Sequence, residues 1–343
     1  MSDRGAISTF DCFGSTCAVH VRGDGPLGTA AKAVEAARER LLDGHRRFTR
    51  FELGSELSRL NADVRDAVPV SDEMARFVAA ALVAAHRSGG LVDATLLSEL
   101  IDAGYGPGGP PPPATWPAPA PLARDIATPV PLRFALERAP ARRPAHAHPA
   151  GRWRELSVDR FARVVRRPAG LTLDSGGIVK GLLADLLGAE LAGHEAYAID
   201  SAGDLRIGGA GGLVRDVRVE SPFDAALLHT FRVRDGGVAT SGIGRRSWLD
   251  GDGAPAHHLL DPASGRPAFT GIVQATALAP SAFEAEWRAK AALLAGPRGA
   301  ARRLLPHGGL IVYDDGSHRL LAPPRVRVRQ AAIEARSPRA SAG

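Results

Sequence analysis

The chain has 343 residues, of which 45% are apolar and 23% charged, and this composition predicts a globular protein with an ample core. It contains no apolar stretch long enough to cross a bilayer and no apolar leader after Met1, so we expect a cytoplasmic protein without a membrane span. The only cysteines, Cys12 and Cys17, exclude a disulfide framework and favour a reducing compartment.

The net charge of +6 raises the question of nucleic-acid binding. The arginines are scattered along the chain, apart from a short basic run at Arg325, Arg327 and Arg329. Aromatic residues make up only 5% of the chain and offer few platforms on which bases could stack. We therefore expect no nucleic-acid partner.

The first hundred residues predict a strand followed by helices. Alternation over residues 8–22 indicates an opening strand, and apolar spacing over residues 28–47 indicates a helix. Ser55 is a candidate helix cap. Ser71 begins a second long helix that ends at the glycine pair Gly89-Gly90.

Residues 105–150 interrupt this pattern with repeated proline and Ala-Pro pairs, which form neither helix interiors nor central strands. They are either a surface insertion, with a short helix near residues 132–137, or a linker between two domains. We predict a single domain over residues 1–323 that carries this segment as an insertion, followed by a disordered basic tail at 324–343.

The second half of the chain predicts mostly hairpins. We expect a hairpin over residues 156–166, paired strands at 196–208, strands at 214–220, 228–234 and 275–279, a helix from Ser281 to about 295, and a closing hairpin at 310–321. Strands that arrive as hairpins favour an α+β fold, with antiparallel sheets and helices packed on one face, over a Rossmann arrangement.

The stretch from residue 171 to 191 combines an apolar strand, a turn over Asp174–Gly177 and a helix. In this helix Ile178, Leu182, Leu186 and Ala189 are predicted to face the core. Backbone N–H groups at Gly176 and Gly177, together with the positive end of the helix, suit an anion. Lys180 can reach back to a phosphate. A plain strand–turn–helix junction explains this stretch about equally well.

Lysine is rare in this chain, occurring only at Lys32, Lys180 and Lys290 among 43 lysines and arginines. A lysine retained where arginine is the usual cation suggests a position that needs a compact ammonium group.

Seven segments, taken in order, resemble the ApbE family of FAD:protein FMN transferases. They are Ser55-Glu-Leu-Ser-Arg-Leu-Asn61, Ser88-Gly-Gly-Leu-Val-Asp-Ala-Thr95, Asp174-Ser-Gly-Gly-Ile-Val-Lys-Gly181, Ala202-Gly-Asp204, Val238-Ala-Thr-Ser-Gly242, His258-Leu-Leu-Asp-Pro-Ala-Ser-Gly265 and Ala279-Pro-Ser-Ala282. Each segment alone is a weak signal, but their order over residues 10–321 makes the match specific.

The resemblance implies a T-fold-like domain that uses FAD and Mg²⁺ to transfer FMN, as a phosphoester, to a Ser or Thr hydroxyl of an acceptor protein with release of AMP. It implies a catalytic role for His258 and a metal contact from the Gly177 carbonyl. It also implies flavin-nucleotide or adenosine contacts from a larger set, namely Phe13, Phe51, Leu91, Val92, Asp93, Asp174, Lys180, Thr240 and Ser241.

His258 suits the role of a base because its pKa range lies near neutrality, and a positioned base contributes about 10²–10⁴-fold to the rate. Its sequence context alone favours a structural histidine that hydrogen-bonds to Asp261, and it is the resemblance that favours catalysis. Asp204 is interpreted as a turn carboxylate, and Thr240 and Ser241 as lining residues rather than nucleophiles.

The chain departs from the family at Glu286 and Lys290, where the family carries an Asp and, four residues later, Thr or Asp as Mg²⁺ ligands. A charged lysine has no lone pair for a metal. Three interpretations are open: Lys290 replaces the metal's charge as a catalytic group, Glu286 holds the metal while Lys290 turns aside, or the pair is an ordinary salt bridge in a protein that does not transfer flavin. We favour the first because lysine is so rare here.

Leu91 and Val92 also depart from the family, which usually has Ala-Phe there, and the change alters the predicted adenosine pocket. The leading hypothesis is a flavin transferase acting on a protein. The alternatives are an FAD pyrophosphatase and a non-catalytic flavin-binding protein. The sequence identifies neither the acceptor nor the oligomeric state.

Overall fold

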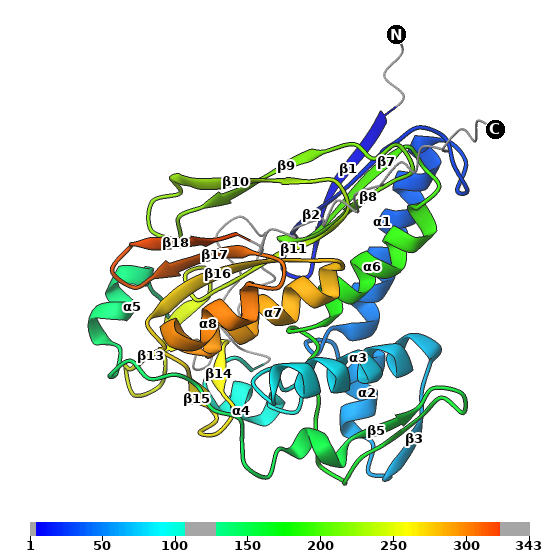
Figure 1. Cartoon of the computed structure of the whole chain (residues 1–343). Coiled ribbons are helices and arrows are strands. Elements are labelled where there is room, and N and C mark those ends of the chain that lie inside the picture. Colours follow the sequence, from blue (N-terminus) through cyan, green and yellow to red (C-terminus); the bar gives the residue numbers. More distant parts are fainter. Residues whose placement is uncertain (1–4, 107–127, 323–343) are drawn as a thin grey trace, which may run out of the picture.

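An eight-stranded antiparallel sheet forms the centre of this computed structural model, which describes residues 5–106 and 128–322 (Figure 1). Its strands in spatial order are β1 (Gly5–Cys12), β2 (Ser15–Arg22), β7 (Ala196–Ser201), β8 (Asp204–Gly208), β11 (Gly236–Gly242), β16 (Ile272–Ala279), β17 (Gly309–Tyr313) and β18 (His318–Leu321). All neighbouring strands in it pair antiparallel. Most of β16 is buried on both of its faces.

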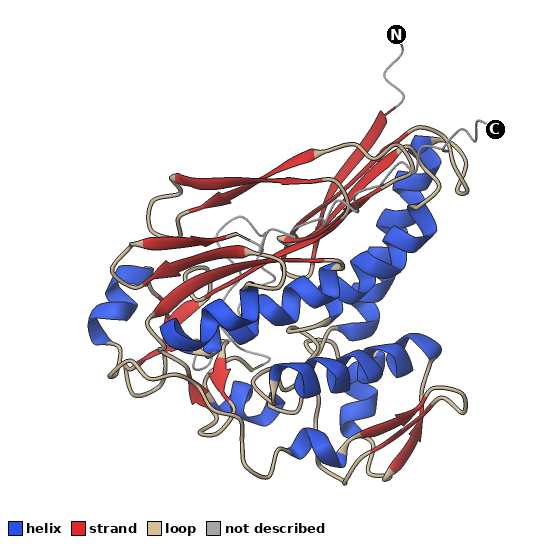
Figure 2. Cartoon of the chain, viewed as in Figure 1, coloured by secondary structure: helices blue, strands red, loops and turns tan. Residues whose placement is uncertain are grey.

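Three helices cover one face of the sheet (Figure 2). Helix α1 (Ala30–Phe48) lies against β1 and β2, α6 (Val179–Leu191) against β7 and β8, and α7 (Ala282–Leu294) against β11 and β16. Helix α8 (Gly296–Leu304) follows α7 and packs on it. The hairpin of β9 (Arg215–Glu220) and β10 (Leu227–Val233) lies on the opposite side of the sheet (Figure 1). The predicted α+β class, with helices on one face of an antiparallel sheet, is confirmed.

A further layer lies beyond these helices, with α3 packed on α6 and α7 (Figure 1). It consists of α2 (Glu56–Ala62), α3 (Asp72–Ser88), α4 (Leu97–Asp102), a short 3₁₀ helix (Arg152–Glu155) and a small sheet of β3 (Ala67–Pro69), β6 (Val164–Arg166) and β5 (Ser157–Asp159).

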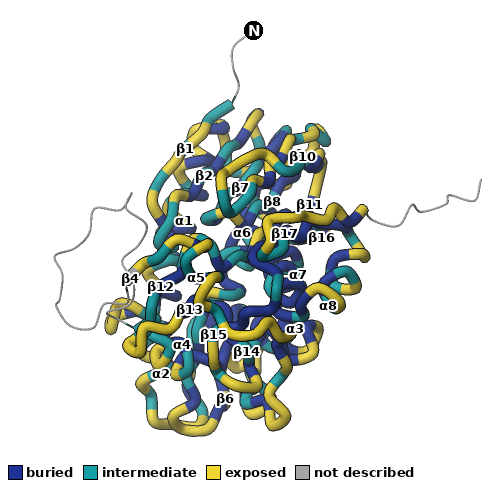
Figure 3. Tube along the Cα trace, turned by 90° about the vertical axis from the view of Figure 1, so that its left-hand side faces the viewer, coloured by how far each residue is buried: buried dark blue, intermediate teal, exposed yellow. Residues whose placement is uncertain are grey.

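The remaining elements are short. They are β4 (Thr128–Pro129), α5 (Leu132–Arg138), β12 (Ser247–Leu249), β13 (Pro255–His257), β14 (Leu260–Asp261) and β15 (Arg266–Pro267). Strands β4, β12 and β13 pair with one another, as do β14 and β15. Figure 3 shows that the buried residues concentrate in the interior of the described chain, while many residues of the outer loops are exposed.

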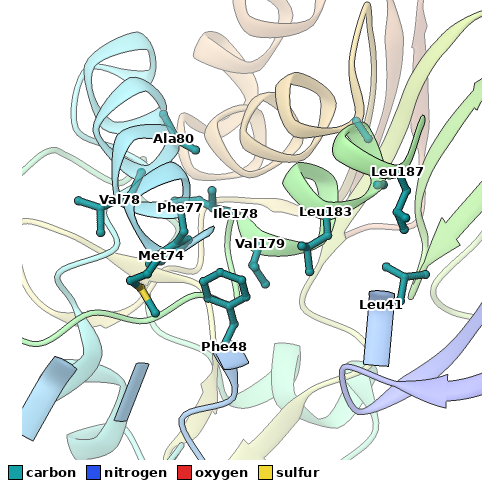
Figure 4. Close-up of a cluster of buried hydrophobic side chains, with 14 of the residues drawn as sticks. Leu41, Phe48, Met74, Phe77, Val78, Ala80, Ile178, Val179, Leu183 and Leu187 are labelled. Atoms are coloured by element: carbon teal, nitrogen blue, oxygen red, sulfur yellow. The ribbon is translucent and has the colours of Figure 1, made fainter. Parts of the chain in front are cut away.

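The main core lies where α1, α3 and α6 meet. Phe48, Phe77 and Leu183 are buried there, and Figure 4 shows them beside Ile178 and Val179 at the start of α6. A second core lies around β16 and β17 and includes residues from the β9–β10 hairpin. Burying a Leu or Phe side chain stabilises the fold by roughly 1.5–3 kcal/mol, so these two cores fix α6 and α7 against the sheet.

The predicted helix caps are confirmed. The Ser55 hydroxyl accepts from the Ser58 N–H at 3.0 Å, Ser71 from Met74 at 3.1 Å and Ser281 from Glu284 at 3.1 Å. Gly89 ends α3 in the left-handed conformation with φ of 69°. Helices α4 and α8 were not predicted from the sequence.

Two predicted strands are wrong in detail. Residues 8–22 form a hairpin rather than one strand, because Phe13 and Gly14 both adopt positive φ and reverse the chain. Residues 171–173 form no strand. The Asn61 amide takes the place of a neighbouring strand there, accepting from the Leu173 N–H at 2.8 Å and donating to the Leu173 carbonyl at 2.9 Å.

The predicted core face of α6 is also wrong in part. Ile178 is buried, but Leu182 and Leu186 are only half-buried and Ala189 is exposed. The helix lies between α1, α3, α7 and the sheet, so its buried positions follow several neighbours rather than one stripe. They are Val179, Gly181, Leu183, Ala184, Leu187, Gly188 and Leu191.

The second part of the proline-rich segment packs on the body of the protein. The Arg143 N–H donates to the Phe269 carbonyl at 3.0 Å and the Ala145 N–H to the Leu294 carbonyl at 2.8 Å. The predicted short helix is present as α5. Residues 107–127 and the predicted tail at 324–343 lie outside the described residues. Within the described ranges, the helices lack the combination of length and apolar character that a membrane span requires.

Helices α6 and α7 approach each other so closely at Gly181 that a side chain does not fit. A methyl group there would lie 2.6 Å from the Ala282 carbonyl oxygen. We expect Gly181→Ala to lower the free energy of unfolding by about 1–3 kcal/mol, because the helices must move apart. Urea denaturation measures the change.

Gly54→Ala is the matched control, since no atom lies within 4 Å of an added methyl group at Gly54. Equal stability of Gly181→Ala and the wild type would contradict this description of the α6–α7 contact.

Candidate functional site

A buried group of four charges lies where α6, α7 and β8 meet. Lys180, in the first turn of α6, forms an ion pair with Asp204 at the start of β8. The Lys180 side chain is 20% exposed and the Asp204 side chain 3% exposed. The sequence analysis interpreted Asp204 only as a turn carboxylate. The structure adds that Asp204 pairs with a lysine of the predicted site.

Glu286 of α7 is fully buried and both of its oxygens are engaged. Oε2 accepts from the Gly181 N–H at 2.9 Å, and Oε1 lies 3.2 Å from Nζ of Lys290, one turn further along α7. The Lys290 side chain is only 12% exposed. The α6 backbone and the α7 lysine are thus joined through one carboxylate.

The charges of this group are mutually dependent. Burial acts to lower the pKa of Lys180, but the carboxylates of Asp204 and Glu286 outweigh it and hold that pKa above its ordinary value. Burial raises the pKa of Glu286, and the charges of Lys290 and Lys180 oppose the rise. Lys180 therefore remains an ammonium at neutral pH.

The predicted turn over Asp174–Gly177, called the glycine turn below, lies directly against this group of charges. A methyl group added to Gly177 would be in contact with Lys290 Cε at 3.4 Å, so the turn and Lys290 are neighbours. Asp174 accepts from the Gly176 N–H at 3.0 Å and lies 3.0 Å from Nε of Arg50. The turn is thereby fixed by its own aspartate and by an arginine that the sequence analysis did not select.

His258 lies within the field of the same cations. Burial lowers the pKa of His258 well below its ordinary value, and the positive charges of Arg246, Lys290 and Lys180 act in the same direction. Its Nδ1 is buried without a hydrogen-bond partner among the described residues. Asp261 instead accepts from the His146 N–H at 2.7 Å and the Ser264 hydroxyl at 2.8 Å, so the structural-histidine interpretation lacks its expected bond.

Aromatic rings and arginines form the wall beside His258. The Tyr105 and Trp248 rings stack at 5.5 Å, and the Arg50 guanidinium lies over the rings of Phe51 at 4.5 Å and Tyr105 at 4.8 Å. Arg246 donates to the Tyr105 hydroxyl at 2.9 Å. Trp248 is fully buried, whereas Phe51 is 52% exposed, and an exposed flat ring can stack a planar heterocycle.

Sequence reasoning missed the arginines and two of the aromatics of this wall. Arg50 and Arg246 were indistinguishable from the many other arginines, and Tyr105 borders the proline-rich segment. Two faint signals were available: Arg50 is next to the predicted Phe51, and Trp248 is one of only four tryptophans in the chain.

The residues predicted for adenosine occupy a different environment. The side chains of Leu91 and Val92 are 7% and 5% exposed and belong to the two cores, not to an open surface. Asp93 accepts from the N–H and the hydroxyl of Thr95 at 2.9 and 2.7 Å, and burial raises its pKa. An adenosine contact from this tripeptide stays a prediction.

The remaining residues predicted to contact the flavin nucleotide are Phe13, Phe51, Thr240 and Ser241. Phe13 occupies the β1–β2 turn, whose Gly14 faces the Arg246 guanidinium, while Phe51 is 52% exposed. On β11, the Thr240 hydroxyl shares a 2.9 Å hydrogen bond with Thr276, and Ser241 is buried. The structure thus brings Lys180, Glu286, Lys290 and Gly177 together, with His258 in their electrostatic field.

The side chains present do not fit a Mg²⁺ site of the kind that the resemblance implies. Mg²⁺ requires an octahedral set of oxygen ligands. Here Glu286 is already bonded to a backbone N–H and an ammonium, and Lys290 offers no lone pair. In the described part of the chain, no group of three or more His, Cys, Asp or Glu residues is placed to hold a metal.

A family model described as "ApbE family" matches residues 13–310. The chain belongs to the ApbE family. Two relatives named FAD:protein FMN transferase are similar to part of it: one from Treponema pallidum is 33% identical over 145 residues, and one from Escherichia coli K12 is 30% identical over 149. These alignments cover 37% and 42% of this chain, and 39% and 42% of the relatives' own lengths.

Solved ApbE structures share the fold. The apo flavinyl transferase ApbE of Pseudomonas stutzeri has a TM-score of 0.71 at 22% identity, covering 93% of this chain and 95% of that one. The ApbE protein of Thermotoga maritima has a TM-score of 0.71 at 20% identity, covering 92% and 97%.

The pairing of Lys180 with Asp204 yields a stability prediction. Lys180→Met leaves a nearly buried carboxylate without its cation, so we expect the free energy of unfolding to fall by about 3 kcal/mol. The double variant Lys180→Met with Asp204→Asn, which removes both charges, should lose less unfolding free energy than Lys180→Met alone. The coupling energy between the two substitutions should be about 1–3 kcal/mol. Urea denaturation of the two single variants and the double variant completes the cycle, and additive effects would contradict the pairing.

Proposed function

We propose that this chain is an FAD:protein FMN transferase. It transfers FMN from FAD to a Ser or Thr hydroxyl of an acceptor protein, forming a phosphoester and releasing AMP. The observation that carries the proposal is the placement of two lysine ammoniums, Lys180 and Lys290, beside the glycine turn, with His258 in their electrostatic field. The names of the relatives similar to this chain support the same activity.

Each part of the site suits one part of the substrate. The ammoniums and the N-terminus of α6 attract the diphosphate. The exposed ring of Phe51, which lies against Tyr105, offers a face on which a flavin ring can stack. These residues bind and orient FAD beside His258, which is half-buried.

The reaction is a displacement at phosphorus. The acceptor hydroxyl oxygen bonds to the phosphorus of the FMN half, the bond from that phosphorus to the bridging oxygen breaks, and AMP leaves with the bridging oxygen. The hydroxyl proton passes to the imidazole of His258. Charge that develops on the phosphoryl oxygens is stabilised by the lysines.

The test is incubation of the chain with FAD and an acceptor protein that carries a flavinylation sequence. We expect flavin fluorescence to remain on the denatured acceptor, a mass increase equal to that of bound FMN, and one AMP per flavin transferred. AMP and FMN without labelled acceptor would identify a pyrophosphatase instead. FAD binding without AMP would identify a non-catalytic binder.

His258→Gln tests the proposed base. We expect transfer to fall by about 10²–10⁴-fold, because the hydroxyl proton loses its acceptor, while FAD affinity changes little. His318→Gln, which alters an exposed histidine of β18, is the matched control. A His258→Gln variant as active as the control would exclude the histidine as base.

The pH dependence follows from the direction of the His258 shift. A base must be neutral to accept a proton, and burial lowers the pKa of His258 well below 6.5 in the free protein. The acidic limb of kcat/KM, which reports on the free enzyme, should therefore fall below pH 6.5. A His258-dependent limb at or above pH 6.5 would contradict this environment.

A further inference from the structure

We propose that this chain binds the diphosphate of FAD without a divalent metal ion, using the ammonium of Lys290 where the family resemblance places a metal ligand. The inference rests on the proposed use of FAD, but it concerns how the diphosphate charge is neutralised rather than what happens to the flavin. It starts from Glu286, Lys290 and Gly177, which lie together.

The first argument is the state of the Glu286 carboxylate. Its Oε2 accepts from the Gly181 N–H at 2.9 Å and its Oε1 lies 3.2 Å from Nζ of Lys290. A metal at this carboxylate would have to displace one of these partners. It would also lie next to an ammonium, whose like charge repels a divalent cation strongly in a buried setting.

The second argument is the position of Lys290. Its Cε lies 3.4 Å from the position that a Cβ on Gly177 would occupy, and its side chain is 12% exposed, so it is held at the turn rather than extended into solvent. An ammonium has three N–H donors. One is directed at Glu286, which leaves two for phosphate oxygens arriving at the Gly176-Gly177 turn.

The third argument concerns the surrounding charges. Lys180 adds a second ammonium, paired with Asp204 and lying in the field of Glu286. A salt bridge with no further role would be expected on the helix surface, because burying an ion pair costs desolvation energy that the pairing often fails to recover. Lys290 and Lys180 are also two of only three lysines in the chain.

The experiment measures FAD affinity of the full chain by quenching of flavin fluorescence, in EDTA and in millimolar MgCl₂. We expect the two dissociation constants of the wild type to agree within about twofold. Lys290→Met should weaken binding by roughly tenfold or more in both buffers, since a hydrogen bond to a charged group is lost. AMP release by the wild type should likewise survive EDTA.

Lys290→Met leaves Glu286 buried without its cation and could destabilise the fold. A second variant therefore separates loss of FAD binding from loss of the fold. Glu286→Gln with Lys290→Met removes both charges together and should fold, as judged by circular dichroism, yet bind FAD as weakly as the single variant. Glu286→Asp with Lys290→Thr recreates a pair of oxygen ligands, and here we expect binding that is weak in EDTA and restored by Mg²⁺.

Two results would overturn the inference: a tenfold or greater gain in wild-type FAD affinity or AMP release on adding Mg²⁺, or unchanged affinity in both variants that lack the Lys290 charge. Failure of the proposed transferase activity is a separate outcome. Metal-independent, Lys290-dependent FAD binding without labelling of an acceptor would support the inference and refute the transferase. Labelling that strictly requires Mg²⁺ would do the reverse.

Discussion

The carboxylate of Glu286 is the constraint on which the site depends. It is fully buried, and it connects the backbone of α6, through the Gly181 N–H, to Lys290 of its own helix. A buried carboxylate without partners is costly, so the two helices must remain at the close separation that Gly181 permits. That separation places the turn before α6 beside the Lys290 side chain.

The rest of the site follows from this contact. With α6 held against α7, Lys180 meets Asp204 at the start of β8, and the cations of both helices act on His258. The lysines are fixed by carboxylates before any substrate arrives, so little reorganisation is needed when an anion binds. Preorganised charge of this kind is what stabilises a phosphoryl group in transfer.

Much of this arrangement was predictable from the sequence because the signals are local. Ser55, Ser71 and Ser281 were identified as caps from the residues that follow them, and the strands were identified from hairpin spacing.

Other features depend on distant contacts. Asn61 replaces a strand beside Leu173, and Arg50 pairs with Asp174 across more than a hundred residues. No periodicity encodes such pairs, and Arg50 could not be told apart from the many other arginines. The rarity of lysine was the one compositional signal that pointed to the site, since Lys180 and Lys290 both lie in it.

The central claim is that two ammonium groups, held by buried carboxylates, receive a diphosphate at the glycine turn. A crystal structure of the chain with FAD, grown in the presence of EDTA, tests it most directly. The account predicts that the diphosphate oxygens lie within hydrogen-bond distance of Nζ of Lys290 and Lys180 and beside Gly176 and Gly177. An FAD molecule bound elsewhere, or a diphosphate whose oxygens contact neither lysine, would contradict it.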